Sequence, residues 1–171
     1  VVDGLSRLET LNCKEVCETI IVNLEVEKSA PEVRISEVNN LGIVELIGKG
    51  ESTFHGSIPS REHNVALTAY KLDGVLIKPG EVFSFNGSVG DISAATGYQS
   101  AYIIKDGRTV LGDGGGVCQD STTMFRAALD AGLPIIERHP HAYRGSYYEQ
   151  GAPEGIDATI YSPSTDFKFL N

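Results

Sequence analysis

The chain has 171 residues, of which 41% are hydrophobic and 22% charged, a balance typical of a globular domain with its own core. Its net charge of −9 argues against binding to nucleic acid or to an anionic membrane surface, because such binding needs clustered Lys and Arg. No stretch reaches the ~20 apolar residues of a membrane-spanning helix, and the first residues do not resemble a signal peptide, so we expect any targeting segment to lie upstream.

Residues 1–51 are predicted to form a separate small α/β unit. Asp3 can cap a short helix, and the run 20–26 passes from continuous apolar residues to the alternation of a strand near a sheet edge. Cys13 and Cys17 are four residues apart and would share one face of a helix. A local disulfide, a zinc site and two half-buried thiols all stay open for this pair.

A core helix is predicted for residues 61–72, with Ser60 as its N-cap. The residues expected on its apolar side are Val65, Ala66, Ala69, Tyr70 and Leu72. A strand over 81–85 follows a Pro-Gly turn, and the run 102–111 is typical of a hairpin that turns at Asp106 and Gly107. This hairpin leads the chain into a glycine-rich loop.

The stretch 112–131 holds the most informative pattern of the chain. Three glycines, 114–116, lead to Cys118, and apolar residues at helical spacing continue through a predicted helix over 119–131. A cysteine therefore lies where a flexible loop becomes a helix, and the unpaired N–H groups and the positive dipole end there favour a nucleophilic thiolate. The glycines would let main-chain N–H groups approach a substrate carbonyl and form an oxyanion hole.

A structural role for Cys118 stays open beside the catalytic one. Most cysteines in globular domains are small buried apolar residues, and a glycine run can simply be a tight turn. Asp120 lies in the first turn of the predicted helix, and its charge would raise the pKa of the Cys118 thiol unless the carboxylate is paired or turned away.

Two histidines follow this helix. If the segment is extended, its period of two puts His139 and His141 on one face together with Glu137, while Arg138 faces the other way. Two imidazoles and an unpaired cysteine are the ingredients of a Cys/His nucleophilic site. Cys118, His139 and His141 could instead bind zinc, which we rank second because no carboxylate base is evident beside them.

Several short motifs, in this order, resemble the VanW domain. They are PGEVFSFN at 79–86, GY at 97–98, GGGVCQ at 114–119, AGL at 131–133, ERHPH at 137–141 and DAT at 157–159. The resemblance runs from about residue 52 to the end, so residues 52–171 are the predicted VanW catalytic domain. The segment before it resembles the tail of a peptidoglycan-binding domain that often precedes a VanW domain.

VanW domains occur in extracytoplasmic proteins of mainly Gram-positive bacteria, and some members have been assigned as L,D-transpeptidases. The resemblance implies a cell-wall enzyme that acts on peptidoglycan stem peptides, without a cofactor or a metal. In the implied reaction, the thiolate of Cys118 attacks the carbonyl between the diamino acid at position three of a stem and D-Ala at position four. D-Ala leaves, and the side-chain amine of another stem resolves the thioester into a 3→3 cross-link.

The same resemblance implies roles for the histidines and the aspartate. His141 matches the last histidine of the family's Arg-x-x-His motif and is the first choice as base, with His139 as an orienting partner or a substitute. Asp157 would orient a histidine, bind the amine of the acceptor, or only end a strand.

Substrate-binding roles are expected for residues around the glycine loop and the histidines. Gly115, Gly116 and Gln119 lie next to Cys118 in the chain, and main-chain N–H groups there would bind the oxyanion. Arg138, if it turns into the cleft, would hold a stem carboxylate with both arms of its guanidinium; on a regular strand it would point away. Ala142 stands where the family has a serine, which removes no proposed catalytic group.

The expected fold is α+β, a mostly antiparallel sheet with the helices 61–72 and 119–131 packed on it and the small N-terminal α/β unit appended. Two other functions stay open. A non-catalytic peptidoglycan-binding module would bury Cys118 and present an open polar groove. A cysteine carboxypeptidase or hydrolase would share the site but pass the acyl group to water.

Overall fold

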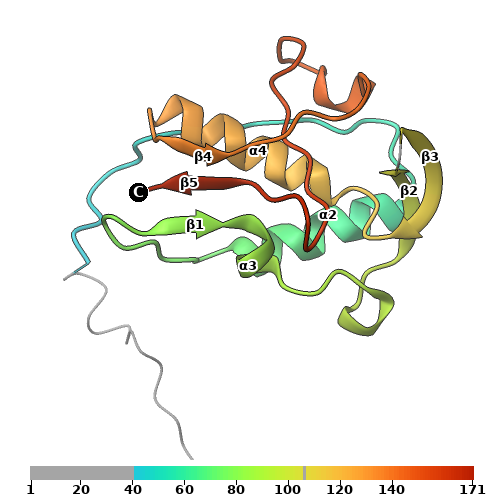
Figure 1. Cartoon of the computed structure of the whole chain (residues 1–171), viewed down its shortest axis with the longest axis horizontal. Helices are drawn as coiled ribbons and strands as arrows, with labels where there is room; N and C mark the ends of the chain where they lie inside the picture. Colours follow the sequence, from blue (N-terminus) through green and yellow to red (C-terminus); the bar gives the residue numbers. More distant parts are fainter. Residues whose placement is uncertain (1–40, 106) are drawn as a thin grey trace, which may run out of the picture. The chain divides into compact units, whose positions relative to one another are not determined.

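The computed structural model describes residues 41–105 and 107–171, and its compact unit is Glu45–Asn171 (Figure 1). The predicted N-terminal unit, including the strand at 20–26 and both Cys13 and Cys17, lies outside the described residues. The predicted boundary between residues 51 and 52 stays a prediction. In the part of the chain that the structure describes, no helix is long and apolar enough to cross a membrane.

The predicted α+β class is confirmed, with antiparallel pairing in both sheets. A three-stranded sheet has the order β1-β5-β4, and β2 and β3 form a separate hairpin. The elements in chain order are α2 (Pro59–Leu72), β1 (Val82–Ser84), α3 (Phe85–Val89), η2 (Ala94–Thr96), β2 (Ser100–Lys105), β3 (Arg108–Asp113), α4 (Val117–Asp130), β4 (Ile135–Glu137), η3 (Ser146–Tyr148) and β5 (Lys168–Leu170).

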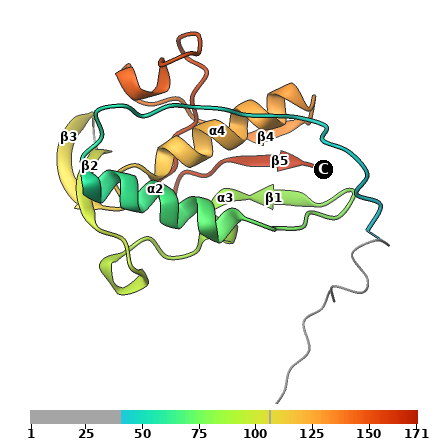
Figure 2. The ribbon, with the colours of Figure 1, turned by 180° about the vertical axis from the view of Figure 1, so that it is seen from behind.

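An aromatic core joins the three-stranded sheet to α4. Phe83 of β1 pairs with Phe169 of the central strand β5, and their ring centroids lie 4.9 Å apart. Phe125 of α4 meets Phe167 edge to face at 5.7 Å. In both ribbon views α2 and α4 lie next to each other on the same side of this sheet (Figures 1 and 2). The core therefore holds α4 through Phe125, because large buried rings dominate packing energetics.

The hairpin and the strand before it are confirmed with small changes. In the hairpin, Tyr102 of β2 lies opposite Leu111 of β3. The strand predicted over 81–85 is shorter, because Phe85 already begins α3. The Ser84 side chain caps this unpredicted helix by accepting a hydrogen bond from the N–H of Gly87 at 3.0 Å.

Helix α2 confirms the predicted helix but not its cap or its buried face. It begins at Pro59 with Ile58 as N-cap, because proline suits the first helical position, so the prediction of Ser60 as the cap is wrong. Tyr70 is 79% exposed, and Ala66 and Ala69 are exposed as well. The buried face is mainly polar and consists of Arg61, Asn64, Val65 and Thr68.

The polar face of α2 has a physical reason. The Asn64 side chain donates to the carbonyl oxygens of Gln99 and Gly115 at 2.8 and 2.9 Å and accepts from the N–H of Gln99 at 2.8 Å. Buried backbone groups need partners, and the loop segments against α2 have no ladder to supply them. Helix α2 thus holds the glycine loop in place.

Candidate active site

The glycine loop places Cys118 in the first turn of α4, as expected from the sequence. Gly116 is the N-cap and has φ 112°, a left-handed conformation that side chains rarely adopt. At Gly115, an added Cβ would lie 2.6 Å from the carbonyl oxygen of Tyr102. The loop therefore needs glycines to pass under β2 and turn into the helix.

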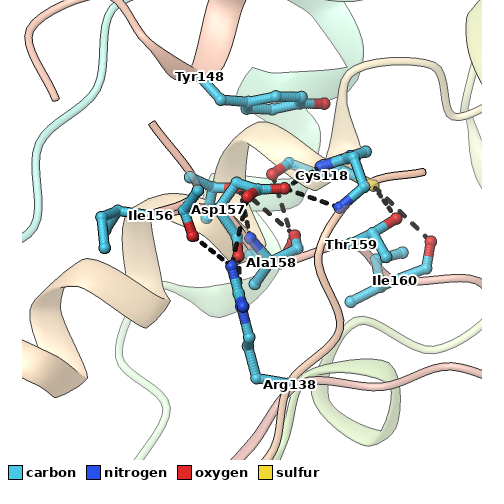
Figure 3. A network of polar contacts seen from close by, with 12 residues as sticks. Cys118, Arg138, Tyr148, Ile156, Asp157, Ala158, Thr159 and Ile160 are labelled. Carbon is cyan, nitrogen blue, oxygen red and sulfur yellow. Dashed lines mark hydrogen bonds and ion pairs between the residues drawn. The ribbon is translucent and has the colours of Figure 1, made fainter. Parts of the chain in front are cut away.

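The thiol of Cys118 is free and partly exposed (Figure 3). Its Sγ lies 3.7 Å from the Thr159 hydroxyl oxygen and 3.7 Å from the carbonyl oxygen of Ile160. The imidazole of His141 also hydrogen-bonds to the thiol. The Thr159 hydroxyl and the His141 imidazole can donate to a thiolate, whereas the carbonyl oxygen of Ile160 accepts from the neutral thiol.

The ring of His141 is held by Asp157 and by Tyr148. Its side chain is only 5% exposed, and Nδ1 lies 2.5 Å from Oδ2 of Asp157. The backbone N–H of His141 donates to the same oxygen at 2.9 Å. Tyr148 stacks on the imidazole with ring centroids 4.2 Å apart. The contact to Asp157 fixes the ring orientation, so the other ring nitrogen is available to Cys118.

The pKa values of the three groups move in the directions of a thiolate–imidazolium pair. Burial raises the pKa of the Cys118 thiol, but the hydrogen bond and charge of His141 outweigh it, so the pKa lies below its ordinary value. Burial lowers the pKa of His141, yet the bonds to Asp157 and Cys118 raise it to about 9. For Asp157, burial raises the pKa, and the hydrogen bonds from His141 bring it below its ordinary value.

Helix α4 is bonded to the segment that carries Asp157 and Thr159. The Ser121 hydroxyl donates to the carbonyl oxygen of Ala158 at 2.6 Å, and the N–H of Ala158 donates to the Thr122 hydroxyl at 3.1 Å. The buried hydroxyl groups of Ser121 and Thr122 therefore connect α4 to the residue after Asp157, which fixes the position of Asp157 relative to Cys118.

Arg138 does not enter the cavity as a ligand for a stem carboxylate. Its Nε donates to the carbonyl oxygen of Asp157 at 2.7 Å, and Nη2 lies 3.3 Å from Oδ1 of the same residue. Figure 3 shows Arg138 reaching Asp157 from the side opposite Tyr148. The substrate-binding prediction for Arg138 is thus not supported, since its guanidinium holds the aspartate that orients His141.

His139 and His141 do not share one surrounding. The His139 side chain is 52% exposed, and its Nε2 lies 3.3 Å from Oε1 of Glu137. Strand β4 ends at Glu137 after an irregularity in its pairing with β5, so the assumed period of two does not hold through Pro140. The structure does not bring His139 to Cys118, and the set of Cys118 and two histidines expected for zinc is not assembled. Among the described residues, no group of three His, Cys, Asp or Glu side chains is placed to hold a metal ion.

Gln119 and Asp120 also differ from expectation. The Gln119 side chain is buried, where its Oε1 accepts from Nη2 of Arg61 at 2.9 Å and its Nε2 donates to the carbonyl oxygen of Thr53 at 3.4 Å, so it does not face a substrate. Burial raises the pKa of Asp120 to about 8, and its Oδ2 is buried without a hydrogen-bond partner. The carboxyl is therefore mainly neutral at pH 7 and repels a Cys118 thiolate little.

A cavity of about 800 Å³ opens beside the thiol. Cys118, His141 and Gly116 line it, together with aromatic side chains from the hairpin and from the segments around η3 and Thr159. The aromatic lining residues are Tyr102, Tyr143, Tyr147, Tyr148 and Tyr161. A cavity of this size suits a peptide-sized ligand.

The sequence interpretation missed three residues of this site. Arg61 and Tyr148 line the cavity, and Thr159 contacts the thiol. Arg61 is the first residue of the predicted helix 61–72, and the buried face of that helix was assigned from apolar residues alone, so a buried arginine was not expected. Tyr148 lies in a stretch without a periodic pattern, so no sequence signal points to it.

Comparison with known proteins gives a family and two relatives. The family model described as "VanW like protein" matches residues 60–171. An "uncharacterized protein YoaR" of Bacillus subtilis (strain 168) is 41% identical over 125 residues, which cover 73% of this chain and 40% of that protein. A "vancomycin B-type resistance protein VanW" of Enterococcus faecalis (strain ATCC 700802 / V583) is 37% identical over 110 residues, which cover 63% of this chain and 40% of that protein. The chain thus spans about two fifths of the length of these relatives, and no solved structure gives a significant match.

Proposed function

The chain belongs to the VanW family, and from this premise we propose that it is a cell-wall L,D-transpeptidase that forms 3→3 peptidoglycan cross-links through a thioester on Cys118. The name of the enterococcal relative, a vancomycin resistance protein, supports a cell-wall context and an extracytoplasmic location. The partners in this proposal are two stem peptides, one as acyl donor and one as amine acceptor.

One observation carries the proposal: a connected set of Cys118, His141 and Asp157 opens into a peptide-sized cavity. Nδ1 of His141 is bound to Asp157, and the same imidazole hydrogen-bonds to the thiol. This is the arrangement of a nucleophile, its base and the group that orients the base. A non-catalytic binding module does not require a partly exposed thiol with a lowered pKa.

Acylation proceeds in the following steps. The thiolate of Cys118 attacks the carbonyl carbon that joins the diamino acid at position three to D-Ala at position four. The oxyanion that forms takes hydrogen bonds from main-chain N–H groups at the start of α4. The C–N bond then breaks, and the imidazolium of His141 gives its proton to the leaving nitrogen of D-Ala.

Transfer to the acceptor reverses these roles. The side-chain amine of a second stem attacks the thioester carbonyl, and neutral His141 takes a proton from that nitrogen. The C–S bond breaks, and Cys118 leaves as a thiolate beside the imidazolium. The product carries an amide between the two position-three residues.

The oxyanion site of this proposal lies at the N-terminal end of α4. Gly116 and Cys118 line the cavity, and no acceptor within the described residues takes up their N–H groups. The N–H groups of Val117 and Gln119 are already bound to the carbonyl oxygens of Gly114 and Gly116 at 3.1 and 2.7 Å. We therefore assign the oxyanion to the N–H groups of Gly116 and Cys118 rather than to Gly115 or Gln119.

The test is mass spectrometry of disaccharide-tetrapeptides after incubation with the protein or with its Cys118→Ala variant. The proposal predicts a dimer joined 3→3, together with free D-Ala, only when Cys118 is present. Loss of D-Ala without a dimer would indicate that water is the acceptor and that the protein is a carboxypeptidase. Unchanged substrate in both samples would contradict the proposal.

A further inference from the structure

Arg61 is a buried cation in the wall of the cavity. The residue is 6% exposed and lies in the first turn of α2. Nη1 donates to the Ser57 hydroxyl at 2.8 Å, and Nη2 donates to Oε1 of Gln119 at 2.9 Å. The Tyr148 hydroxyl is a third hydrogen-bond partner of this guanidinium. All three partners are neutral, and a guanidinium has five N–H groups to satisfy.

No carboxylate of the described residues forms an ion pair with this guanidinium. Asp120 is a carboxyl group that interacts electrostatically with Arg61. Burial raises the pKa of this carboxyl to about 8, so it carries little charge at pH 7. Burying a charge is unfavourable unless an opposite charge compensates it. The uncompensated charge of Arg61 therefore needs an explanation.

Arg144 provides the contrast within the same cavity. It also lines the wall, but it is exposed and forms ion pairs with Glu149 and Glu154 at 2.8 and 2.7 Å. Of these two arginines, only Arg61 lacks an ion pair with a carboxylate of the described residues.

The position of Arg61 relates it to the reacting atoms. Its side chain packs against the loop before the nucleophile, where a Cβ on Gly116 would lie 2.8 Å from Cγ of Arg61. Tyr147 covers the guanidinium, with the ring centroid 4.2 Å from Cζ. Arg61, Gly116 and Cys118 all line one cavity. An anionic group of the substrate close to the scissile bond is thus within the range of this cation.

We infer that Arg61 binds the C-terminal carboxylate of the donor stem, so that the site selects stems that end at position four. This inference rests on the proposed function. In it, Arg61 replaces Arg138 as the residue that binds the stem carboxylate. The donor carries its free carboxylate on D-Ala, the residue directly after the scissile bond, and Arg61 lines the same cavity as Cys118. Bidentate binding of that carboxylate would orient the scissile carbonyl toward Cys118.

The experiment measures binding by calorimetry with the Cys118→Ala variant of the 171-residue chain, which needs no turnover. The two ligands are a disaccharide-tetrapeptide that ends in the D-Ala carboxylate and the same compound with a C-terminal carboxamide. We expect the carboxamide to bind about 10- to 100-fold more weakly, the effect of losing a charge-assisted pair. Equal affinity for the two ligands, or no binding of either, overturns the inference.

Variants of Arg61 distinguish binding of the carboxylate from a purely structural role of this residue. With Arg61→Gln added, the affinity ratio of the two ligands should fall to about 1, whereas a structural role would weaken both ligands alike and leave the ratio unchanged. Arg61→Lys keeps the positive charge but loses the planar donors that bind a carboxylate bidentately. It should give an intermediate affinity ratio. Arg144→Gln is the matched control and should keep the full ratio. If Arg61→Gln does not fold in a thermal unfolding scan, the lysine variant and the ratio with Arg61 intact decide.

This test can fail separately from the proposed function. A 3→3 dimer with a ratio of 1 would support the transpeptidase and overturn the role of Arg61. A ratio that depends on Arg61 without any dimer would support carboxylate binding and contradict the transfer reaction.

Discussion

The two ends of α4 lie in opposite surroundings. At its N-terminal end, the thiol, an imidazole and two carboxyl groups are wholly or partly buried around the glycine loop. Further along, Phe125 and Ala128 pack on the aromatic core with Phe167. Buried ionisable groups reduce stability unless they are paired, whereas apolar burial adds to it. The apolar half of α4 is therefore assigned to stability, and the polar end is where we place the proposed chemistry.

Cys118→Ala gives the largest expected effect and acts on the polar end alone. The release of D-Ala should fall by about 10⁴-fold or more, because the covalent route is lost. The midpoint of thermal unfolding should change little, since the thiol is partly exposed. The measurements are kcat/KM and a thermal unfolding scan. A variant that keeps activity would place the nucleophile elsewhere.

Phe167→Ala gives the next largest effect and acts on the aromatic core against which the apolar half of α4 packs. The Phe167 side chain is fully buried between Phe125 and Phe169. Its removal should cost about 3–5 kcal/mol of unfolding free energy, from lost burial and the cavity that remains. Urea denaturation measures this loss, and Phe167→Leu, a milder change, should cost less. A loss under about 1 kcal/mol would contradict the assignment of this half as the stabilising one.

Asp157→Asn returns to the polar end with a smaller effect. We expect kcat/KM to fall by about 10- to 100-fold, because the amide neither orients His141 nor supports its charge. The pKa of His141 is raised to about 9, so the imidazolium and the stability it adds are present below its ordinary pKa of 6.5 and are lost as the pH rises through about 9. The variant should therefore lose activity at a lower alkaline pH.

The matched control for this change lies at the other end of the helix. Asp130 is the last residue of α4, and its Oδ2 accepts an exposed hydrogen bond from the N–H of Lys49 at 2.9 Å. Asp130→Asn should leave the pH profile of kcat/KM unchanged. If both variants shifted the profile equally, the effect would come from net charge and not from the contact with His141.

His139→Gln should have the smallest effect of the series. Its ring is half exposed on Glu137 and lies outside the cavity wall. We expect kcat/KM within about 2-fold of the unchanged protein, as for a surface substitution. His141→Gln, assayed beside it, should lose nearly all activity. Comparable losses in the two variants would restore His139 as a partner of the nucleophile.

Sequence patterns predicted the elements whose signals are local. The glycine run before Cys118 marked the start of α4, and the turn residues marked the hairpin. Both follow from backbone conformation, which a short stretch determines. The α+β class followed from the alternation of such elements together with the family motifs.

Features that depend on tertiary contacts could not be predicted from local sequence patterns. The buried face of α2 is polar because Asn64 satisfies backbone groups of a loop 51 residues away. Arg138 was expected at the substrate if its side chain turned into the cleft, and Gln119 because it follows Cys118 in the chain. Both side chains instead bond to neighbouring segments of the protein. Asp157 had three open roles, and its contact with His141 supports the orienting one.

The most direct test of the account is the pH dependence of Cys118 alkylation by iodoacetamide, measured by mass spectrometry beside a free-cysteine control. We expect the rate to level off at a lower pH than the rate of free cysteine, because His141 lowers the pKa of the Cys118 thiol below its ordinary value. An ordinary thiol ionises at roughly pH 8.5. In the His141→Gln variant, the alkylation rate should rise over the same pH range as the rate of free cysteine. If the unchanged protein also followed the control, Cys118 would be an ordinary thiol and the central claim would be wrong.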